Sequence, residues 1–490
     1  MQTVDLIIFL TFTLGVVIFG CSFFRRNASA EEFTSAGRSL PGWVVGMSIF
    51  ATYVSSISYI GYPGKAFASD WNAFVFSLSI PVASYVAARW FVPFYRRSGS
   101  VSAYAFQEER FGRWARLYAS ACYLLTQVAR MGSILYLLAV PMHILMGWNL
   151  HGVIILTTVA VVAYSMMGGI RAVIWADALQ GFILIGGALL CLVVLMASMP
   201  EGPLQTFRLA AHSPLGNKFS LGDFSADLTK STFWVCLIYG IFINLQNYGI
   251  DQNYVQRYHA AKTDGDARFS ALFGGYLFIP VSALFFLIGS ALYSYYTAGV
   301  AALPAEIAAK PDYVFPFFIV SSLPVGLRGL LIASIFAAGM STVSTSVTSA
   351  ATILLTDYVK PLRKGKAASD VVVLRSASVG IGILGCLVAI AMLSVESIID
   401  AWWTLSSIFS GGMLGLFLLG IIPQKISRRA ALAGTLCGVG VIGWISMAGL
   451  WHLPGTHLHE YLAIVLGTTT IFLVGFFPIM IKKRGKRLRH

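Results

Sequence analysis

The chain is a succession of long apolar runs separated by short polar connections. The first run extends from about Val4 to Phe23, and twelve more are each long enough to cross a bilayer at about 1.5 Å per helical residue. These twelve lie near residues 41–66, 71–94, 114–146, 150–167, 172–197, 231–255, 268–296, 327–357, 371–394, 399–422, 429–451 and 459–481. The pattern predicts an all-α polytopic membrane protein with about thirteen transmembrane helices.

Composition supports the membrane class. Hydrophobic residues make up 57% of the 490 residues and charged residues 11%, with a mean hydropathy of +0.77, which is more apolar surface than a soluble core could bury. The chain begins with Gln2 and Asp5, whereas a signal peptide begins with basic residues. We therefore expect the first run to be a retained helix with its N-terminus outside.

The net charge of +14 comes from basic residues placed after alternate helices, which is the pattern of cytoplasmic loops in membrane proteins and argues against a nucleic-acid partner. The alternation predicts a cytoplasmic C-terminus in a bacterial inner membrane. The cysteines lie in or at the ends of apolar runs without CxxC spacing, so we interpret them as small core residues. They are Cys21, Cys122, Cys191, Cys236, Cys386 and Cys437.

Two charged residues lie near membrane depth. Arg130 is fourteen residues beyond Arg116, about 21 Å at helical rise, and Asp177 is six residues beyond Arg171. Arg89 is close enough to its helix end to reach the interface. A charge at membrane depth costs several kcal/mol, so it is usually functional or paired. Either Arg130 and Asp177 serve a ligand, or they form an ion pair that holds the bundle.

A hydroxyl cluster lies within residues 338–346. Ser341, Ser344 and Thr345 share one helix face, and Thr342 is adjacent. Such oxygens can replace part of the hydration shell of a small cation. The alternative is that they bond to carbonyls of their own helix or hold helices together.

The second predicted helix is irregular. Hydroxyl residues follow one another around Tyr53 to Ser58, and Gly61 and Pro63 come after them. If the helix unwinds near Tyr53 to Ser56, its first half ends in free carbonyls, such as those of Ala51 and Val54, suited to a cation. Its second half then begins with N–H groups suited to an anion. An ordinary helix with a Gly/Pro-rich outer end is the alternative.

The seventh predicted helix is also polar, with Asn244, Gln246 and Asn247 at bilayer depth. Because it follows the second by five helices, an odd number, two five-helix units would enter the membrane from opposite sides, as in the LeuT-like inverted repeat. The predicted division is a single transport domain over 1–490. It comprises an extra helix at 4–23, a first repeat at 41–197, a second repeat at 231–422 and two last helices at 429–481.

Three stretches in this order resemble the sodium/solute symporter family: Gly168 to Gln180, Asp251 to Tyr258, and the 338–346 cluster. Within that family the chain is most similar to bacterial sodium-coupled sialic acid symporters. That similarity rests on Phe50 to Ser58, on Ala68 to Trp71 and on Arg130.

The resemblance implies two co-transported sodium ions and a substrate carboxylate. The implied first sodium site uses Ala51, Val54, Ala338, Ser341 and Thr342, and the second uses Asp177, Ser341, Ser344 and Thr345. An unpaired carboxylate facing a hydroxyl stripe is a suitable cation ligand, so we expect Asp177 to be unpaired. The implied substrate residues are Tyr53, Ser55, Ser56, Ser58, Ser77, Arg130 and Asn247. Tyr53 and Ser77 depart from the small Thr and the Gln of the sialic acid members, which reshapes the pocket.

The resulting hypothesis is alternating-access import of a small carboxylate, with N-acetylneuraminate as the expected substrate, by a monomeric carrier. Another sugar acid, a sugar or an amino acid stays open as the substrate, and so does proton coupling through Asp177. The histidines lie in loops or at helix ends, which argues against a haem or metal enzyme. The connections near 199–230 and 297–326 could form short surface helices or a gate.

Overall fold

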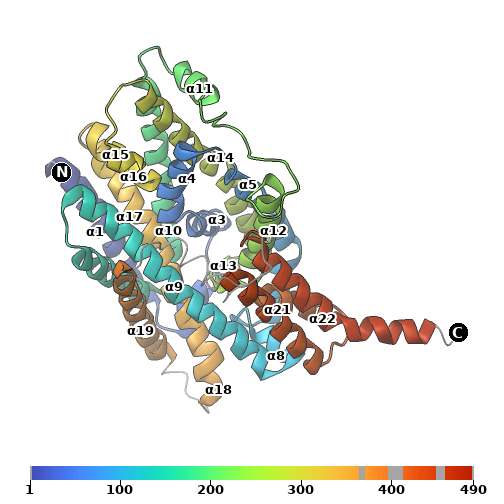
Figure 1. Ribbon diagram of the computed structural model, residues 1–490. Coiled ribbons are helices and arrows are strands. Elements are labelled where there is room, and N and C mark those ends of the chain that lie inside the picture. The colour runs from blue at the N-terminus through green and yellow to red at the C-terminus, as the bar shows by residue number, and fades with distance from the viewer. Residues whose placement is uncertain (1–2, 364–369, 395–411, 449–457, 488–490) are drawn as a thin grey trace.

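The computed structural model describes residues 3–363, 370–394, 412–448 and 458–487 (Figure 1). Its regular structure there is helical, apart from one isolated bridge between Leu40 and Ala261. Apolar runs form helices because a backbone in hydrocarbon must satisfy its own hydrogen bonds. The main helices are α1 (Thr3–Cys21), α2 (Ala30–Ser35), α3 (Gly42–Tyr53), α4 (Ser56–Ala68), α5 (Phe74–Leu78), α6 (Ile80–Val86), η3 (Ala87–Phe91), α7 (Val92–Ser98), α8 (Ala105–Phe111), α9 (Arg113–Met146), α10 (Leu150–Ala197), α11 (Leu204–Ala211), α12 (Phe233–Ile250), α13 (Gln252–Ala260), α14 (Asp264–Thr297), α15 (Ala305–Ala308), α16 (Pro311–Ser322), α17 (Leu327–Ile353), η4 (Leu354–Val359), α18 (Lys360–Leu362), α19 (Asp370–Ala391), α21 (Arg428–Ala448) and α22 (Leu462–Arg487).

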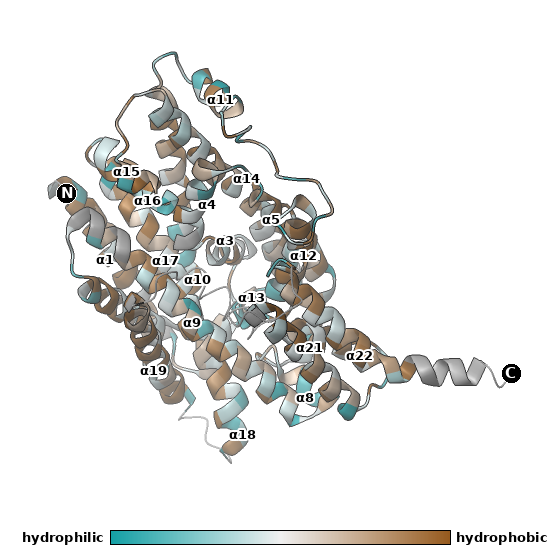
Figure 2. Ribbon diagram, viewed as in Figure 1, coloured by the Kyte–Doolittle hydropathy of each residue, from teal (hydrophilic) through white to brown (hydrophobic). Residues whose placement is uncertain are grey.

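Ten helices of the described ranges are long and apolar enough to cross a membrane, and the bent pair α3 and α4 makes eleven. Figure 2 shows hydrophobic residues along these helices. The predicted spans at 150–167 and 172–197 are joined in α10. Most of the predicted span at 399–422 lies outside the described residues, and its described end, Gly412–Ile421, is an apolar helix. The count of thirteen therefore stays a prediction.

Gly169 breaks α10 in two. Forty-eight residues in one straight helix would extend about 72 Å, more than twice the hydrocarbon thickness. Gly169 has φ 54° and ψ −153°, a conformation that favours glycine. A Cβ there would lie 2.9 Å from the backbone of Phe33. The break thus falls between the two predicted spans.

The core centres on α17, which is buried along almost its whole length. It packs against α10, α9, α1 and α3. On the other side of α3, helix α14 packs against both α3 and α4, and Figure 1 shows α3 enclosed by the surrounding helices. Gly289 permits this close packing, since a Cβ there would lie 2.3 Å from the carbonyl oxygen of Pro63.

The two long connections contain short helices. The one near 199–230 contains α11, and the one near 297–326 contains α15 and α16. Helix α16 packs against α4, the second half of the bent pair.

Candidate functional site

The second span is broken where the sequence predicts it. Helix α3 ends at Tyr53, Val54 and Ser55 are extended, and α4 begins at Ser56. The two halves are bent by 52°. The predicted break is confirmed, and the alternative of one regular helix is wrong.

Two carbonyls at the end of α3 face side chains from other helices. Arg130 of α9 donates from Nη2 to the Thr52 carbonyl oxygen at 3.3 Å. The hydroxyl of Ser341 on α17 lies 3.5 Å from the Ala51 carbonyl oxygen. The break therefore presents a cationic group on one side and a hydroxyl on the other.

Asp177 connects α10 to this same point. Its Oδ1 accepts a hydrogen bond from Ser341 at 2.7 Å, and its Oδ2 accepts one from Ser48 of α3 at 2.6 Å. The carboxylate is fully buried. Ser341 thus lies between a carboxylate and the end of the broken helix, which places three oxygens within reach of one small cation.

The prediction that Asp177 is unpaired is wrong. Arg257 donates from Nη2 to its Oδ2 at 2.7 Å, and both side chains are fully buried. The partner is therefore Arg257 rather than Arg130, so the alternative pair of Arg130 and Asp177 is wrong as well. The sequence pattern did not indicate this pair, because Arg257 follows the predicted span at 231–255 and basic residues just after a span are typical of cytoplasmic loops.

Arg257 reaches the interior because the chain turns at Asp251. Helix α12 ends at Ile250, and Asp251 caps the following helix by accepting a hydrogen bond from the Asn253 N–H at 2.8 Å. Every residue of α13 is buried, although the helix is polar. An aspartate in the N-cap position followed by amide residues was the available signal of a new helix start.

Arg257 uses its donors on four partners in this interior. Besides Asp177, Nε donates to Ser48 at 2.8 Å, Nη1 to the Asn253 carbonyl at 2.6 Å and Nη2 to Thr345 at 2.7 Å. This guanidinium therefore occupies two of the ligands predicted for the second sodium, Asp177 and Thr345.

Other residues of the hydroxyl cluster bond within their helix. Thr342 donates to the Ala338 carbonyl at 3.1 Å, and Ser344 donates to the Ser341 carbonyl at 3.0 Å. These contacts match the alternative expected for intramembrane hydroxyls, whereas Ser341 bonds to another helix. The hydrogen bond from Thr342 to the Ala338 carbonyl joins two oxygens that a cation could bind in its place. The hydroxyl would then rotate so that its proton points away and its lone pairs face the cation.

The predicted substrate residues fall into two groups. Tyr53 bonds to Asn244, and Asn247 donates to the Tyr53 hydroxyl at 3.2 Å. Its ring stacks on Tyr248, with 5.5 Å between centroids. Tyr53 therefore bridges α3 to α12, the seventh predicted span.

Ser55, Ser56 and Ser58 lie on the other side of the break, whereas Ser77 is in α5. Ser55 and Ser58 are buried at the start of α4, whereas the side chain of Ser56 lies outside the described part. Ser77 forms a 2.7 Å hydrogen bond with Ser282 of α14. Ser77 is thus engaged with α14 rather than with Tyr53.

Asp251 is a further charged group that the predicted site did not include. It interacts electrostatically with both Arg130 and Arg257. Its carboxylate therefore lies in the electrostatic field of both the candidate substrate arginine and the arginine that pairs with Asp177.

Comparison with known proteins identifies a family and similar transporters. Residues 33–438 match the model of the sodium:solute symporter family. The chain is 30% identical to the sodium/sialic acid symporter NanT of Aliivibrio fischeri, over 97% of this chain and 92% of that protein. It is also 30% identical to the sodium/sialic acid symporter SiaT of Proteus mirabilis, over 97% and 94%.

A solved structure shares the fold. It is a sodium-coupled sialic acid symporter in a substrate-bound outward-open state, described as revealing a novel sodium site, with a TM-score of 0.90, 28% identity and 97% coverage of each chain. The all-α polytopic fold predicted from the sequence is confirmed. This chain belongs to the sodium:solute symporter family, whose members are transporters rather than enzymes.

Proposed function

We propose that this protein imports sialic acid (N-acetylneuraminate) together with sodium by alternating access. The observation that carries the proposal is the position of Ser341, 2.7 Å from Asp177 and 3.5 Å from the end of α3, with Arg130 on the neighbouring carbonyl. Cation ligands and an anion-binding group thus meet at one broken helix. The similarity to NanT and SiaT supports the choice of substrate.

The proposed first sodium site comprises the carbonyls of Ala51, Val54 and Ala338 with the hydroxyls of Ser341 and Thr342. Hard oxygen ligands suit sodium, and the carbonyl end of a half-helix carries partial negative charge. Sodium bound there would join α3 to α17. Because sodium and substrate both bind at the break, each would favour the conformation that the other needs.

The proposed second sodium site is Asp177 with Ser341, Ser344 and Thr345. In the described structure Arg257 holds Asp177 and Thr345. Sodium must therefore compete with the guanidinium for these oxygens. Binding at the second site would release Arg257 from Asp177, from Thr345 or from both.

The substrate carboxylate is proposed to bind to Arg130 and to the hydroxyls and N–H groups of Ser55, Ser56 and Ser58 at the start of α4. A guanidinium can hold a carboxylate through two hydrogen bonds. Tyr53, Asn247 and Ser77 would line the rest of the pocket. Arg130 must then exchange its 3.3 Å bond to the Thr52 carbonyl for the substrate.

We place the protein in a bacterial inner membrane as a monomer, with its N-terminus outside and its C-terminus in the cytoplasm. The proposed repeats are 41–197 and 231–422.

Two sodium ions with one monoanion would move one positive charge inward, and the membrane potential would contribute about 2.3 kcal/mol per 100 mV to this movement. Uptake would then generate a current, and charge-neutral transport would exclude this stoichiometry.

The test is uptake of labelled N-acetylneuraminate into proteoliposomes under an inward sodium gradient or an equal potassium gradient. Wild type, Arg130→Ala and the control Arg208→Ala, an exposed arginine of α11, would be compared. Sodium-dependent uptake that is lost only in Arg130→Ala is expected. Uptake driven by a proton gradient without sodium would favour the proton-coupled alternative. Sodium-dependent uptake of another sugar acid, a sugar or an amino acid would change only the substrate.

A further inference from the structure

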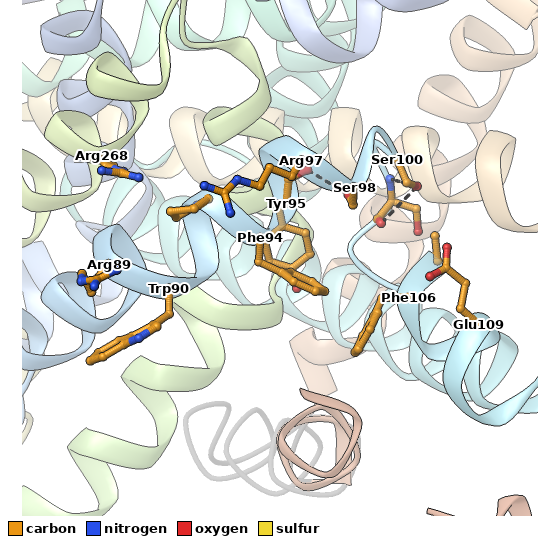
Figure 3. Close-up of a pocket in the computed structure, with 13 residues that line it drawn as sticks. Arg89, Trp90, Phe94, Tyr95, Arg97, Ser98, Ser100, Phe106, Glu109 and Arg268 are labelled. Atoms are coloured by element: carbon orange, nitrogen blue, oxygen red, sulfur yellow. Dashed lines mark hydrogen bonds between the residues drawn. The ribbon is translucent and has the colours of Figure 1, made fainter. Parts of the chain in front are cut away.

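A cavity of about 560 Å³ lies where η3 and α7 meet α8 and the start of α14, and none of its lining residues belongs to the proposed transport site (Figure 3). It is lined by three arginines, Arg89, Arg97 and Arg268, and by aromatic residues that include Trp90 and Phe94. The spans that border it are Phe74–Ser98 and Asp264–Thr297. Arg97 is in the last turn of one span and Arg268 in the first turns of the other. The cavity is therefore at the depth of lipid headgroups.

The charges around the cavity are unbalanced. In the described part of the chain, none of Arg89, Arg97 and Arg268 takes part in an ion pair. Asp264, the nearby acid, is paired with Arg96, which also donates to the Tyr258 and Ala261 carbonyls. Asp264 attracts Arg97 and Arg268 only at longer range.

Asp264 does not line the cavity, and the acidic residue among the lining residues is Glu109. Figure 3 shows Glu109 at the end opposite Arg89, with the Arg97 guanidinium directed toward the side of Arg89 and Arg268. An anion at the arginine end would therefore meet three guanidinium groups before it met a carboxylate.

Arg89 is the group that most needs an anion. It precedes Arg97 by eight residues, which places it about 12 Å deeper along the span. Its guanidinium lies 5.9 Å from the ring centre of Trp90, an exposed side chain. An arginine at this depth is costly unless it reaches a phosphate or another anion at the interface.

The surface next to the cavity is apolar and aromatic. Val82 and Tyr85 of α6 and Phe269 and Tyr276 of α14 are exposed there, on two helices that pack together. On a membrane span, exposed side chains of this kind contact acyl chains, and aromatic residues favour the interface. The arginines and the apolar face together match a molecule with an anionic head and hydrocarbon tails.

We infer that this cavity binds the phosphate of an anionic phospholipid, with Arg89, Arg97 and Arg268 as its ligands and the exposed face of α6 and α14 as the seat of its acyl chains. Arginine suits this role because its planar donors bind a phosphate through two hydrogen bonds. The inference depends on membrane placement and not on the identity of the transported substrate.

The test uses full-length protein, delipidated in detergent, and measures bound lipid by native mass spectrometry together with the melting temperature. Phosphatidylglycerol is compared with phosphatidylcholine and with glycerol phosphate, which has the head but no tails. Phosphatidylglycerol is expected to bind and to raise the melting temperature, whereas the other two have little effect.

Glutamine at Arg97 or Arg268 is expected to weaken phosphatidylglycerol binding about fivefold each, as for one arginine at a lipid surface. The matched control is Arg429→Gln, an exposed arginine outside the cavity. Equal binding of the two phospholipids, or unchanged binding in the double variant Arg97→Gln/Arg268→Gln, would overturn the inference. A glycerol phosphate effect equal to that of phosphatidylglycerol would replace the lipid with a soluble phosphate. Lipid-free melting temperatures of the variants, if equal to wild type, exclude a folding defect.

Discussion

Asp177 and Arg257 form a fully buried ion pair, 2.7 Å from oxygen to nitrogen, inside the proposed second sodium site. Removing one partner of such a pair leaves an uncompensated charge, which typically costs about 3–5 kcal/mol. Arg257→Gln is therefore expected to melt well below wild type in sodium-free buffer. Added sodium should recover more of its melting temperature than it adds to wild type, because the ion can take the place of the guanidinium.

The double variant Asp177→Asn/Arg257→Gln is the control. With both charges removed, its stability should exceed that of Arg257→Gln, and sodium should not add the extra stabilisation. Equal sodium effects in wild type and Arg257→Gln would mean that the ion and the arginine do not share ligands.

Tyr53→Phe tests the bridge between α3 and α12. The change keeps the ring stack on Tyr248 and leaves Asn244 and Asn247 without the hydroxyl. In the proposed pocket this hydroxyl also contacts the substrate. Losing one such hydrogen bond costs about 1 kcal/mol, so we expect substrate affinity to fall about fivefold in equilibrium binding. Tyr276→Phe, an exposed tyrosine of α14, is the control and should bind as wild type. Unchanged affinity in Tyr53→Phe would place substrate away from this hydroxyl.

Gly289→Ala tests the contact between α14 and α4. The added methyl group would lie 2.3 Å from the Pro63 carbonyl oxygen, where the neighbour is backbone and cannot turn away. Overpacking of this kind costs about 1–3 kcal/mol, so the melting temperature should fall. Gly186→Ala on α10 meets nothing within 4 Å and should leave stability unchanged or raise it slightly. A drop of the same size in both variants would contradict the packing argument.

His259 of α13, outside the apolar spans, gives a pH prediction. Burial, with the nearby charges of Arg38 and Arg96, lowers its pKa from 6.5 to about 4. Between these values the unfolded chain binds a proton that the folded chain excludes, so stability is lost as pH falls below about 6.5. The loss at pH 5 is about 2 kcal/mol relative to neutral pH.

The measurement is the melting temperature in detergent at pH 7.5 and pH 5 for wild type and His259→Gln. Other groups titrate alike in both proteins, so the variant should lose less on acidification. An equal fall in melting temperature for both proteins would show that protonation of His259 does not destabilise the folded protein.

The sequence predicted those parts of the site that depend on local pattern. The break at Tyr53 to Ser56 follows from hydroxyl, Gly and Pro residues in one short stretch, and the cluster around Ser341 follows from helical spacing. The pairing of Asp177 could not be found this way. It depends on the turn at Asp251, which directs Arg257 into the interior, and on packing between helices far apart in the chain. The partners of Tyr53 on α12 were missed for the same reason.

The burial of α17 bears on how the protein can move. This helix carries Ser341 and is enclosed by α10, α9, α1 and α3. Any tilt of α17 would break close packing on all these sides at once, whereas α3 and α4 meet at Val54 and Ser55, where the helix is already interrupted. We therefore expect α17 to stay fixed during the transport cycle, while α3 and α4 rotate relative to each other about Val54 and Ser55.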